Sequence, residues 1–159
     1  MWSESHDQEL SDIFSVQEVI ARAVANKLTG ALLKDKTAPL VRTGTVNTAA
    51  YQAYLQGRYK LSQRADGAED ALEFFKKAIE LDSSFAAAHA GLGNAYLWLG
   101  YSNTLPSHEA FPQARSYARR ALDIDAQSAY AWSILGSVQL WYDWDWAAAK
   151  AALDSAIVL

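Results

Sequence analysis

Cysteine is absent from the 159 residues of this chain, which excludes a disulfide framework, a thiolate nucleophile and a cysteine-type zinc site. Basic residues are also few, and the formal net charge of −4 argues against a nucleic-acid-binding surface, which needs clustered Lys and Arg. No apolar run approaches the ~20 residues of a membrane helix, and the N-terminus lacks the basic and apolar regions of a signal peptide. We therefore expect a cytoplasmic protein that binds neither nucleic acid nor membrane.

Signals of catalysis are missing as well. The histidines His6, His89 and His108 lack the helical spacing of a pair of metal ligands. Asp123 and Asp125 could act as paired carboxylates, but they more simply end a helix and face water. No glycine-rich phosphate loop and no strand pattern occur. We expect no catalytic, cofactor-binding or metal-binding residues, and no enzymatic activity in these residues.

The chain instead carries a repeated pair of short phrases. The first phrase reads His89-x-x-Leu92-Gly93-x-x-Tyr96 and returns from Trp132 to Gly136. The second phrase opens at Ala78, Ala121 and Ala156, in steps of 43 and 35 residues. Fixed periods of this size indicate stacked pairs of helices, which build a surface for partners.

The apolar spacing predicts six helices in this region. Their expected ranges are 48–63, 68–82, 85–100, from after residue 112 to about 124, 127–141 and 145–158. Asp66 and Gly67 are expected to form a turn, and Gly100 a left-handed helix end. Residues 101–112, which contain Pro106 and Pro112, are expected to form a long loop that stretches the 43-residue step.

The first 46 residues follow a different pattern. A capping box from Ser15 to Glu18 and an apolar stripe from Ile13 to Leu28 predict one long helix, and residues 34–46 read as a linker. We therefore divide the chain into an N-terminal helix and linker (1–46) and a repeat domain (47–159). The repeat domain has three units, at about 47–84, 85–126 and 127–159.

With these phrases in place, the chain resembles the tetratricopeptide repeat family. The match is specific in the second and third units and looser in the first, and Ser83 and Ala126 stand where the family usually has proline. The resemblance implies an all-α fold, a right-handed α-solenoid of about three helical hairpins. Here it would be preceded by the long N-terminal helix.

A narrower resemblance covers most of the chain. Residues 2–18 resemble the tail of a TolB-like domain and the helix after it, and segments 51–59, 109–112 and 141–146 resemble the repeats that follow such a domain. This arrangement is typical of bacterial signalling proteins, often with an N-terminal adenylyl cyclase, kinase or winged-helix domain. The resemblance implies that this chain is the C-terminal piece of such a protein, with any catalysis outside it.

The segment from Trp141 to Trp146 holds three tryptophans and two aspartates. Such a cluster could bind a sugar, a cationic peptide or a proline-rich ligand. We favour a structural interpretation instead, in which Asp143 or Asp145 caps the last helix and the aromatics pack into the second unit.

The concave groove is the binding surface that the family resemblance implies. Its expected residues come from the first helices of units two and three: Ala87, Ala90, Asn94, Trp98, Tyr130, Ser133, Ser137 and Trp141. Family members that bind a peptide's terminal carboxylate use groove Lys, Arg and Asn, and here only Asn94 offers a comparable group. An apolar peptide or helix suits this groove better.

Three functions are weighed for the chain. The leading one is a non-catalytic protein-interaction module, the scaffold or sensory part of a larger signalling protein with a protein or peptide partner. The alternative is self-association as a homodimer through exposed apolar residues such as Leu153 and Ile157. A minor alternative is a fragment of an adenylyl cyclase whose catalytic residues lie elsewhere.

Overall fold

The structure, a computed structural model, describes residues 17, 19–20, 44–63 and 65–159. In this part the chain is helical and has no strand, which confirms the all-α prediction. The elements are α2 (Thr48–Leu61), α3 (Ala65–Leu81), α4 (Ala86–Tyr101), α5 (Ser107–Ile124), α6 (Ala129–Val138), the π-helical η2 (Gln139–Asp143) and α7 (Trp146–Val158). The helix predicted from Ile13 lies, apart from residues 17, 19 and 20, outside the described residues.

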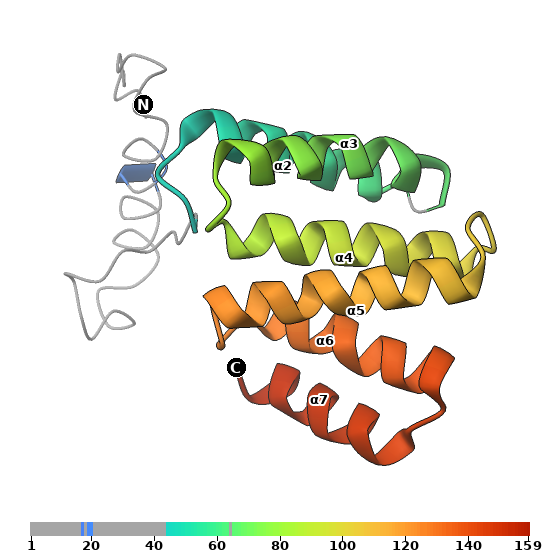
Figure 1. Ribbon diagram of the computed structural model, residues 1–159. Coiled ribbons are helices and arrows are strands. Elements are labelled where there is room, and N and C mark those ends of the chain that lie inside the picture. The colour runs from blue at the N-terminus through green and yellow to red at the C-terminus, as the bar shows by residue number, and fades with distance from the viewer. Residues whose placement is uncertain (1–16, 18, 21–43, 64) are drawn as a thin grey trace, which may run out of the picture.

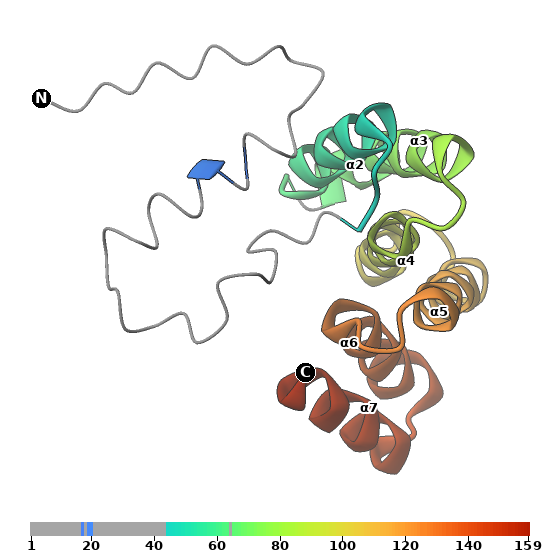
Figure 2. The same ribbon diagram turned by 90° about the vertical axis from the view of Figure 1, so that its left-hand side faces the viewer.

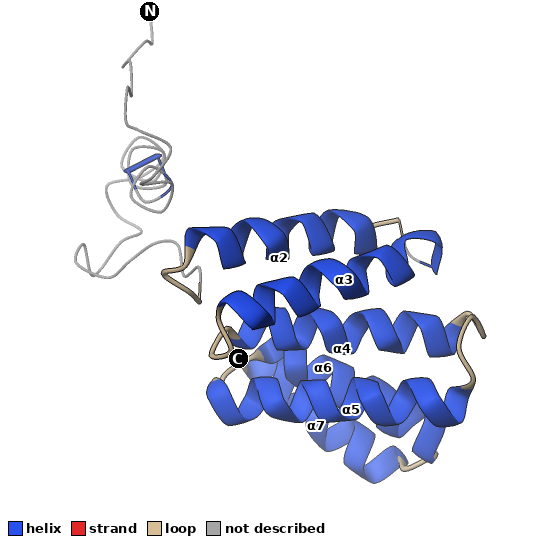
Figure 3. Cartoon of the chain, turned by 45° about the horizontal axis from the view of Figure 1, so that its top comes forward, coloured by secondary structure: helices blue, strands red, loops and turns tan. Residues whose placement is uncertain are grey.

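Each helix packs mainly against the helices before and after it in the chain. The result is a curved row of antiparallel hairpins, α2–α3, α4–α5 and α6–α7 (Figures 1 and 3). Contacts also join α2 to α4 and α4 to α6. Viewed nearly along the helices, these three lie toward the inner side of the row, with α3, α5 and α7 behind them (Figure 2). Within the described ranges, no helix combines the length and the apolar character that a membrane crossing needs.

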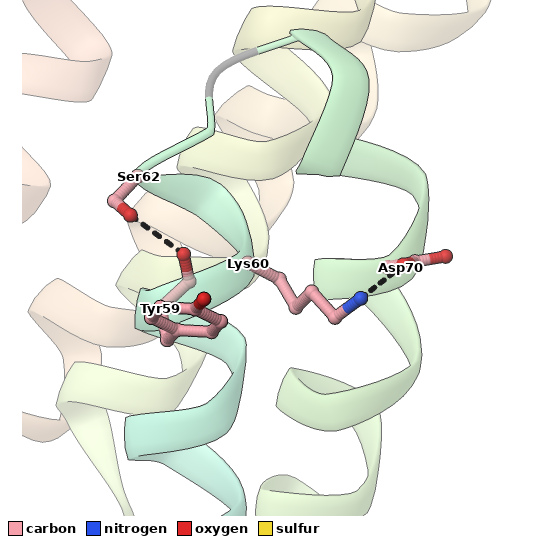
Figure 4. Close-up of polar contacts among 4 residues, drawn as sticks. All are labelled: Tyr59, Lys60, Ser62 and Asp70. Atoms are coloured by element: carbon pink, nitrogen blue, oxygen red, sulfur yellow. Dashed lines mark hydrogen bonds and ion pairs between the residues drawn. The ribbon is translucent and has the colours of Figure 1, made fainter.

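Small residues set the spacing of the first hairpin. The buried residues of α2 are Ala50, Ala53, Gly57 and Leu61, whereas Tyr59 is 67% exposed. Phe75 of α3 is fully buried, and a Cβ added at Gly57 would lie 2.8 Å from its ring. The glycine is therefore needed where the two helices approach each other most closely. At the rim of the hairpin, the Lys60 ammonium donates to the Asp70 carboxylate at 2.7 Å (Figure 4).

The expected turn at Asp66 and Gly67 is wrong, because both residues belong to α3. The turn comes earlier, after Leu61, and the Ser62 hydroxyl donates to the Tyr59 carbonyl at 2.7 Å (Figure 4). A Cβ at Gly67 would lie only 2.0 Å from the Lys60 carbonyl oxygen. This glycine serves close backbone approach between the ends of α2 and α3 rather than a turn.

The loop predicted for residues 101–112 is also wrong. The connection is short, since α4 ends at Tyr101 and α5 begins at Ser107. Gly100 is a buried helical residue, and a Cβ there would lie 2.9 Å from the Ala110 Cβ. The left-handed residue is Asn103, with φ of 57°. The long 43-residue step therefore comes mainly from long helices, of 16 residues in α4 and 18 in α5.

Pro112 lies inside α5, in its second turn. Proline has no amide hydrogen, so the carbonyl four residues back, at His108, loses its helical partner. His108 lies in the first turn of α5, and its side chain is 77% exposed. His108 itself is helical, contrary to its expected place in a loop.

A second set of polar contacts joins the start of α2 to the end of α3. The Thr45 hydroxyl donates to the Asp82 carboxylate, which also accepts from the Ser84 hydroxyl at 2.6 Å and the Ser84 amide at 2.9 Å. The Asn47 side chain donates to the Leu81 carbonyl at 2.9 Å and caps α2 through the Ala50 amide. The hydrogen bonds from Ser84 and Thr45 lower the pKa of the Asp82 carboxyl.

This lowered pKa predicts a pH dependence. Stability from Asp82 is present above the ordinary carboxyl pKa of 3.8 and is lost as the pH falls through the lower folded value. We expect Asp82→Asn to lower the urea midpoint at pH 7 and to lower it by less at pH 2.5, which is below the ordinary carboxyl pKa. The exposed Asp154→Asn, whose partner Lys150 lies on the same helix, is the matched control. Equal effects of Asp82→Asn at both pH values would contradict the role of its charge.

Candidate binding surfaces

The inner helices carry two neighbouring surfaces, one polar and one aromatic. Helix α4 is buried along most of its length, as its small residues predict, so its partners come from both sides. Of the predicted groove residues, Ala90 is fully buried in the core and offers nothing to a partner. Tyr130 and Trp141 are 39% and 43% exposed. The other predicted groove residues are half-buried: Ala87, Asn94, Trp98, Ser133 and Ser137.

Two of the predicted residues meet directly. The Asn94 side-chain amide of α4 donates to the Tyr130 hydroxyl of α6 at 2.6 Å, which joins the second hairpin to the third. Burial raises the pKa of Tyr130 to about 12, although the bond from Asn94 acts the other way. The hydroxyl therefore stays protonated at neutral pH. Because its oxygen accepts from Asn94, its hydrogen is left to donate.

Two residues of α2 extend this polar group, and neither is among the predicted groove residues. The Arg58 guanidinium carbon lies 5.9 Å from the centre of the Tyr54 ring. Tyr54 and Arg58 both act electrostatically on the Tyr130 hydroxyl, Tyr54 raising its pKa and Arg58 lowering it. Among the described residues no carboxylate pairs with Arg58. We call Tyr54, Arg58, Asn94 and Tyr130 the inner polar cluster.

The inner polar cluster changes the expectation that only Asn94 could bind a carboxylate. Arg58 is not among the predicted groove residues, because these come only from the first helices of units two and three. Its place one helical turn after Tyr54 was the available signal, since such residues share a helix face. Arg58 and the Tyr130 hydroxyl provide donors suited to an anionic group.

Aromatic side chains continue the inner surface toward the other end of α4. The Trp98 and Tyr101 rings lie 5.8 Å apart in an edge-to-face arrangement, and the Tyr101 and Trp141 rings lie 5.0 Å apart. Beside them is a hollow of about 530 Å³, which we call the aromatic hollow. Its aromatic and apolar walls are Tyr101, Phe111, Leu140, Trp141, Trp144 and Trp146.

The aromatic hollow is shaped by the connection between α6 and α7. Here η2 replaces the last α-helical turn, and Trp144 follows in the left-handed region with φ of 58°. The Asp145 carboxylate caps α7 by accepting from the Ala148 amide at 3.0 Å, as the structural interpretation of the cluster expected. Asp143 has a different role, because it accepts from the Arg115 guanidinium at 2.5 Å.

The aromatic residues of this segment divide into two groups. Tyr142 stacks on Phe111 with ring centres 5.1 Å apart, and Trp141 contacts Tyr101, so these two do pack against the second hairpin. Trp144 and Trp146 are 69% and 63% exposed and lie edge to face 6.1 Å apart. The structural interpretation therefore explains half of the cluster and leaves two tryptophans presented to solvent.

The other candidates from the sequence are His89, Asp123 and Asp125, and their surroundings are those of structural residues. His89 is 6% exposed, with its Nε2 atom 3.0 Å from the Ser83 carbonyl, as a core histidine would be. Asp125 ends α5 and its carboxylate accepts from the Gln127 amide at 3.0 Å. Asp123 is exposed on the last turn of α5 and lines a shallow depression with Arg115, Arg119 and Arg120.

Comparison with known proteins gives one distant similarity. No model of a known protein family matches the chain. A protein of Rhizobium meliloti (strain 1021) named "Putative adenylate cyclase 3" is 31% identical to it over 93 residues. The match covers 58% of this chain and 16% of that protein, so the chain is similar to a small part of a longer protein. This similarity agrees with the adenylyl cyclase-type resemblance that the sequence indicates.

Proposed function

We propose that residues 47–159 form a non-catalytic protein-interaction module, made of three tetratricopeptide-type hairpins stacked as a right-handed α-solenoid. The module is the scaffold or sensory part of a larger signalling protein, and any cyclase activity lies in other residues of that protein. The similarity to a small part of the Rhizobium protein supports this division.

The observation that carries the proposal is the inner polar cluster. Three helices from three different hairpins contribute to it, and the Asn94–Tyr130 hydrogen bond joins two of them. Stacked repeats place such residues on one surface, where each hairpin adds a contact to the same extended ligand. Arg58 and the Tyr130 hydroxyl would hold a polar group of that ligand, and Trp98 would contact apolar side chains beside it.

Selection of 12-residue peptides from a random display library on the whole chain tests this function. We expect selected peptides, resynthesised with a fluorescent label, to bind in anisotropy titrations. Arg58→Glu should weaken them about tenfold, because it removes a charged donor and adds repulsion, and Tyr130→Phe about threefold.

Arg119→Glu is the matched control, since Arg119 is also exposed but belongs to α5 and faces the depression beside Asp123. It makes the same charge change and should leave peptide affinity within about twofold. The proposal fails if no peptide is enriched over bare support. It also fails if both glutamate variants weaken binding equally.

Self-association is a second candidate, favoured by one observation. Ile157 and Val158 on the last turn of α7 are 82% and 85% exposed. Multi-angle light scattering at increasing concentration should then show a dimer that Ile157→Lys and Val158→Lys abolish together. A mass that stays monomeric throughout removes this candidate.

A further inference from the structure

The aromatic hollow is a separate feature from the inner polar cluster, and the interaction function does not account for it. We propose that it binds an arginine side chain presented by a partner protein, with the guanidinium lying against the exposed indoles of Trp144 and Trp146. This inference goes beyond the proposed function and is tested independently of it.

The backbone around the hollow indicates a purpose beyond packing. A bulky residue such as tryptophan is rarely found in the left-handed region, because its side chain crowds the backbone there. Trp144 with φ of 58° gains little core packing in return, because 69% of it is exposed. A π-helical segment, itself common at functional sites, directly precedes it.

The hollow is also held in place. The Asp145 amide donates to the Gln139 carbonyl at 3.0 Å, the Asp145 carboxylate caps α7, and Asp143 is bound to Arg115 across to α5. Asn103, the other left-handed non-glycine residue among those described, also lines the hollow. Fixed walls favour binding because little side-chain and loop entropy is lost when a ligand enters.

Charge decides among the ligands that an aromatic surface could take. No Lys or Arg occurs in segments 78–114 and 121–149, which supply every lining residue. Of the basic groups on the neighbouring helices, Arg115 of α5 is paired with Asp143 and Lys150 of α7 with Asp154. Asp145 is exposed between the two tryptophans, where its carboxylate caps α7 through the Ala148 amide and pairs with no basic residue among those described. Its negative charge beside the hollow favours a cation over a sugar or a proline-rich peptide.

The open aromatic surface favours a guanidinium over an ammonium. Trp144 and Trp146 are 69% and 63% exposed, so they form an open surface rather than an enclosed cage. A guanidinium is planar, weakly hydrated and stacks on aromatic faces, whereas an ammonium is compact and strongly hydrated. Arginine on an extended segment can therefore lie flat in the hollow, and lysine gains less from the same surface.

Tryptophan indole N–H resonances of the isotope-labelled whole chain give a direct test. The probe is the peptide acetyl-Gly-Arg-Gly-amide, and its matched neutral isostere carries citrulline in place of arginine. We expect the arginine peptide to shift the Trp144 and Trp146 resonances saturably and to bind about fivefold more tightly than the citrulline peptide. Trp132, whose indole donates to the Ala126 carbonyl at 3.1 Å, is the internal reference and should not shift.

Two variants separate charge from structure. Asp145→Asn retains an N-cap residue of nearly equal strength while removing the charge, so it should keep the fold and weaken the arginine peptide about twofold or more. Trp144→Ala should remove most of the binding. Equal affinity for the arginine and citrulline peptides overturns the inference, as does an absence of shifts at Trp144 and Trp146. Preferential shifts with glucose, oligoproline or choline would assign the hollow to another ligand and overturn it too.

Discussion

Replacing Phe75 with alanine is expected to lower the free energy of unfolding by about 3–5 kcal/mol. The Phe75 ring is fully buried between the first and second hairpins, among Leu61, Leu92 and Leu99, and lies 5.9 Å from the Tyr54 ring. Its removal leaves a cavity where two glycine-lined helices meet. Because domains of this size are stable by only about 5–15 kcal/mol, urea unfolding should show a large fall in midpoint.

Phe74 provides the matched control for this change. It is the same residue type on the same helix, but it is half-buried and faces a shallow depression beside Leu55 and Tyr59. Phe74→Ala should cost clearly less, about 1–2 kcal/mol, because a smaller apolar area returns to water. Similar losses for the two variants would contradict the assignment of Phe75 to the core.

A substitution at Gly91 also tests the packing around Phe75. A Cβ at this position would lie 2.5 Å from the Phe75 ring, so Gly91→Ala should destabilise the wild-type chain by about 1–3 kcal/mol. In the Phe75→Ala background the collision disappears and alanine favours the helix by up to about 1 kcal/mol, so the sign should reverse. A double-mutant cycle with no coupling between these residues would refute this packing.

Replacing Phe111 with alanine is the second large effect, about 3–5 kcal/mol of unfolding free energy. Phe111 is 4% exposed, stacks on Tyr142, and shares a core cluster with Leu97 of α4 and Ile134 of α6. The ring therefore connects the second and third hairpins at the base of the aromatic hollow. Chemical denaturation followed by circular dichroism measures the loss.

Phe111→Leu is the control, because it keeps most of the apolar volume and should cost about 1.5 kcal/mol or less. If leucine is as harmful as alanine, ring stacking on Tyr142 rather than buried volume is the main contribution. An alanine variant that loses less than about 1 kcal/mol would show that Phe111 is not a core residue.

The two wrong predictions about glycine have the same cause. The sequence predicts a turn at Gly67 and a left-handed helix end at Gly100, because conformational freedom is the commonest reason for a glycine. Both are helical, and a Cβ at either would collide with a neighbouring helix. Sequence alone does not distinguish a glycine needed for its backbone freedom from one needed for its lack of a side chain, because the residue it would collide with belongs to another helix.

The candidate sites also contain some residues that the sequence predicts and others that only the structure reveals. The groove residues Asn94 and Tyr130 could be projected from the repeat phrases because they lie on the well-matched second and third units. Arg58 lies on the loosely matched first unit and is not among the predicted groove residues, although its spacing of four residues from Tyr54 indicated a shared helix face. The exposure of Trp144 and Trp146 depends on η2, a local change of helical winding that the apolar spacing did not reveal.

The sequence by itself determined that the chain is helical, where most of its helices lie, and that small residues recur where they meet. Those are properties of spacing and side-chain size, which act over a few residues. Only the tertiary structure decided which side chains face one another, such as Asn94 with Tyr130 and Arg115 with Asp143. These contacts join residues 36 and 28 positions apart, and packing of whole helices, rather than local preference, brings them together.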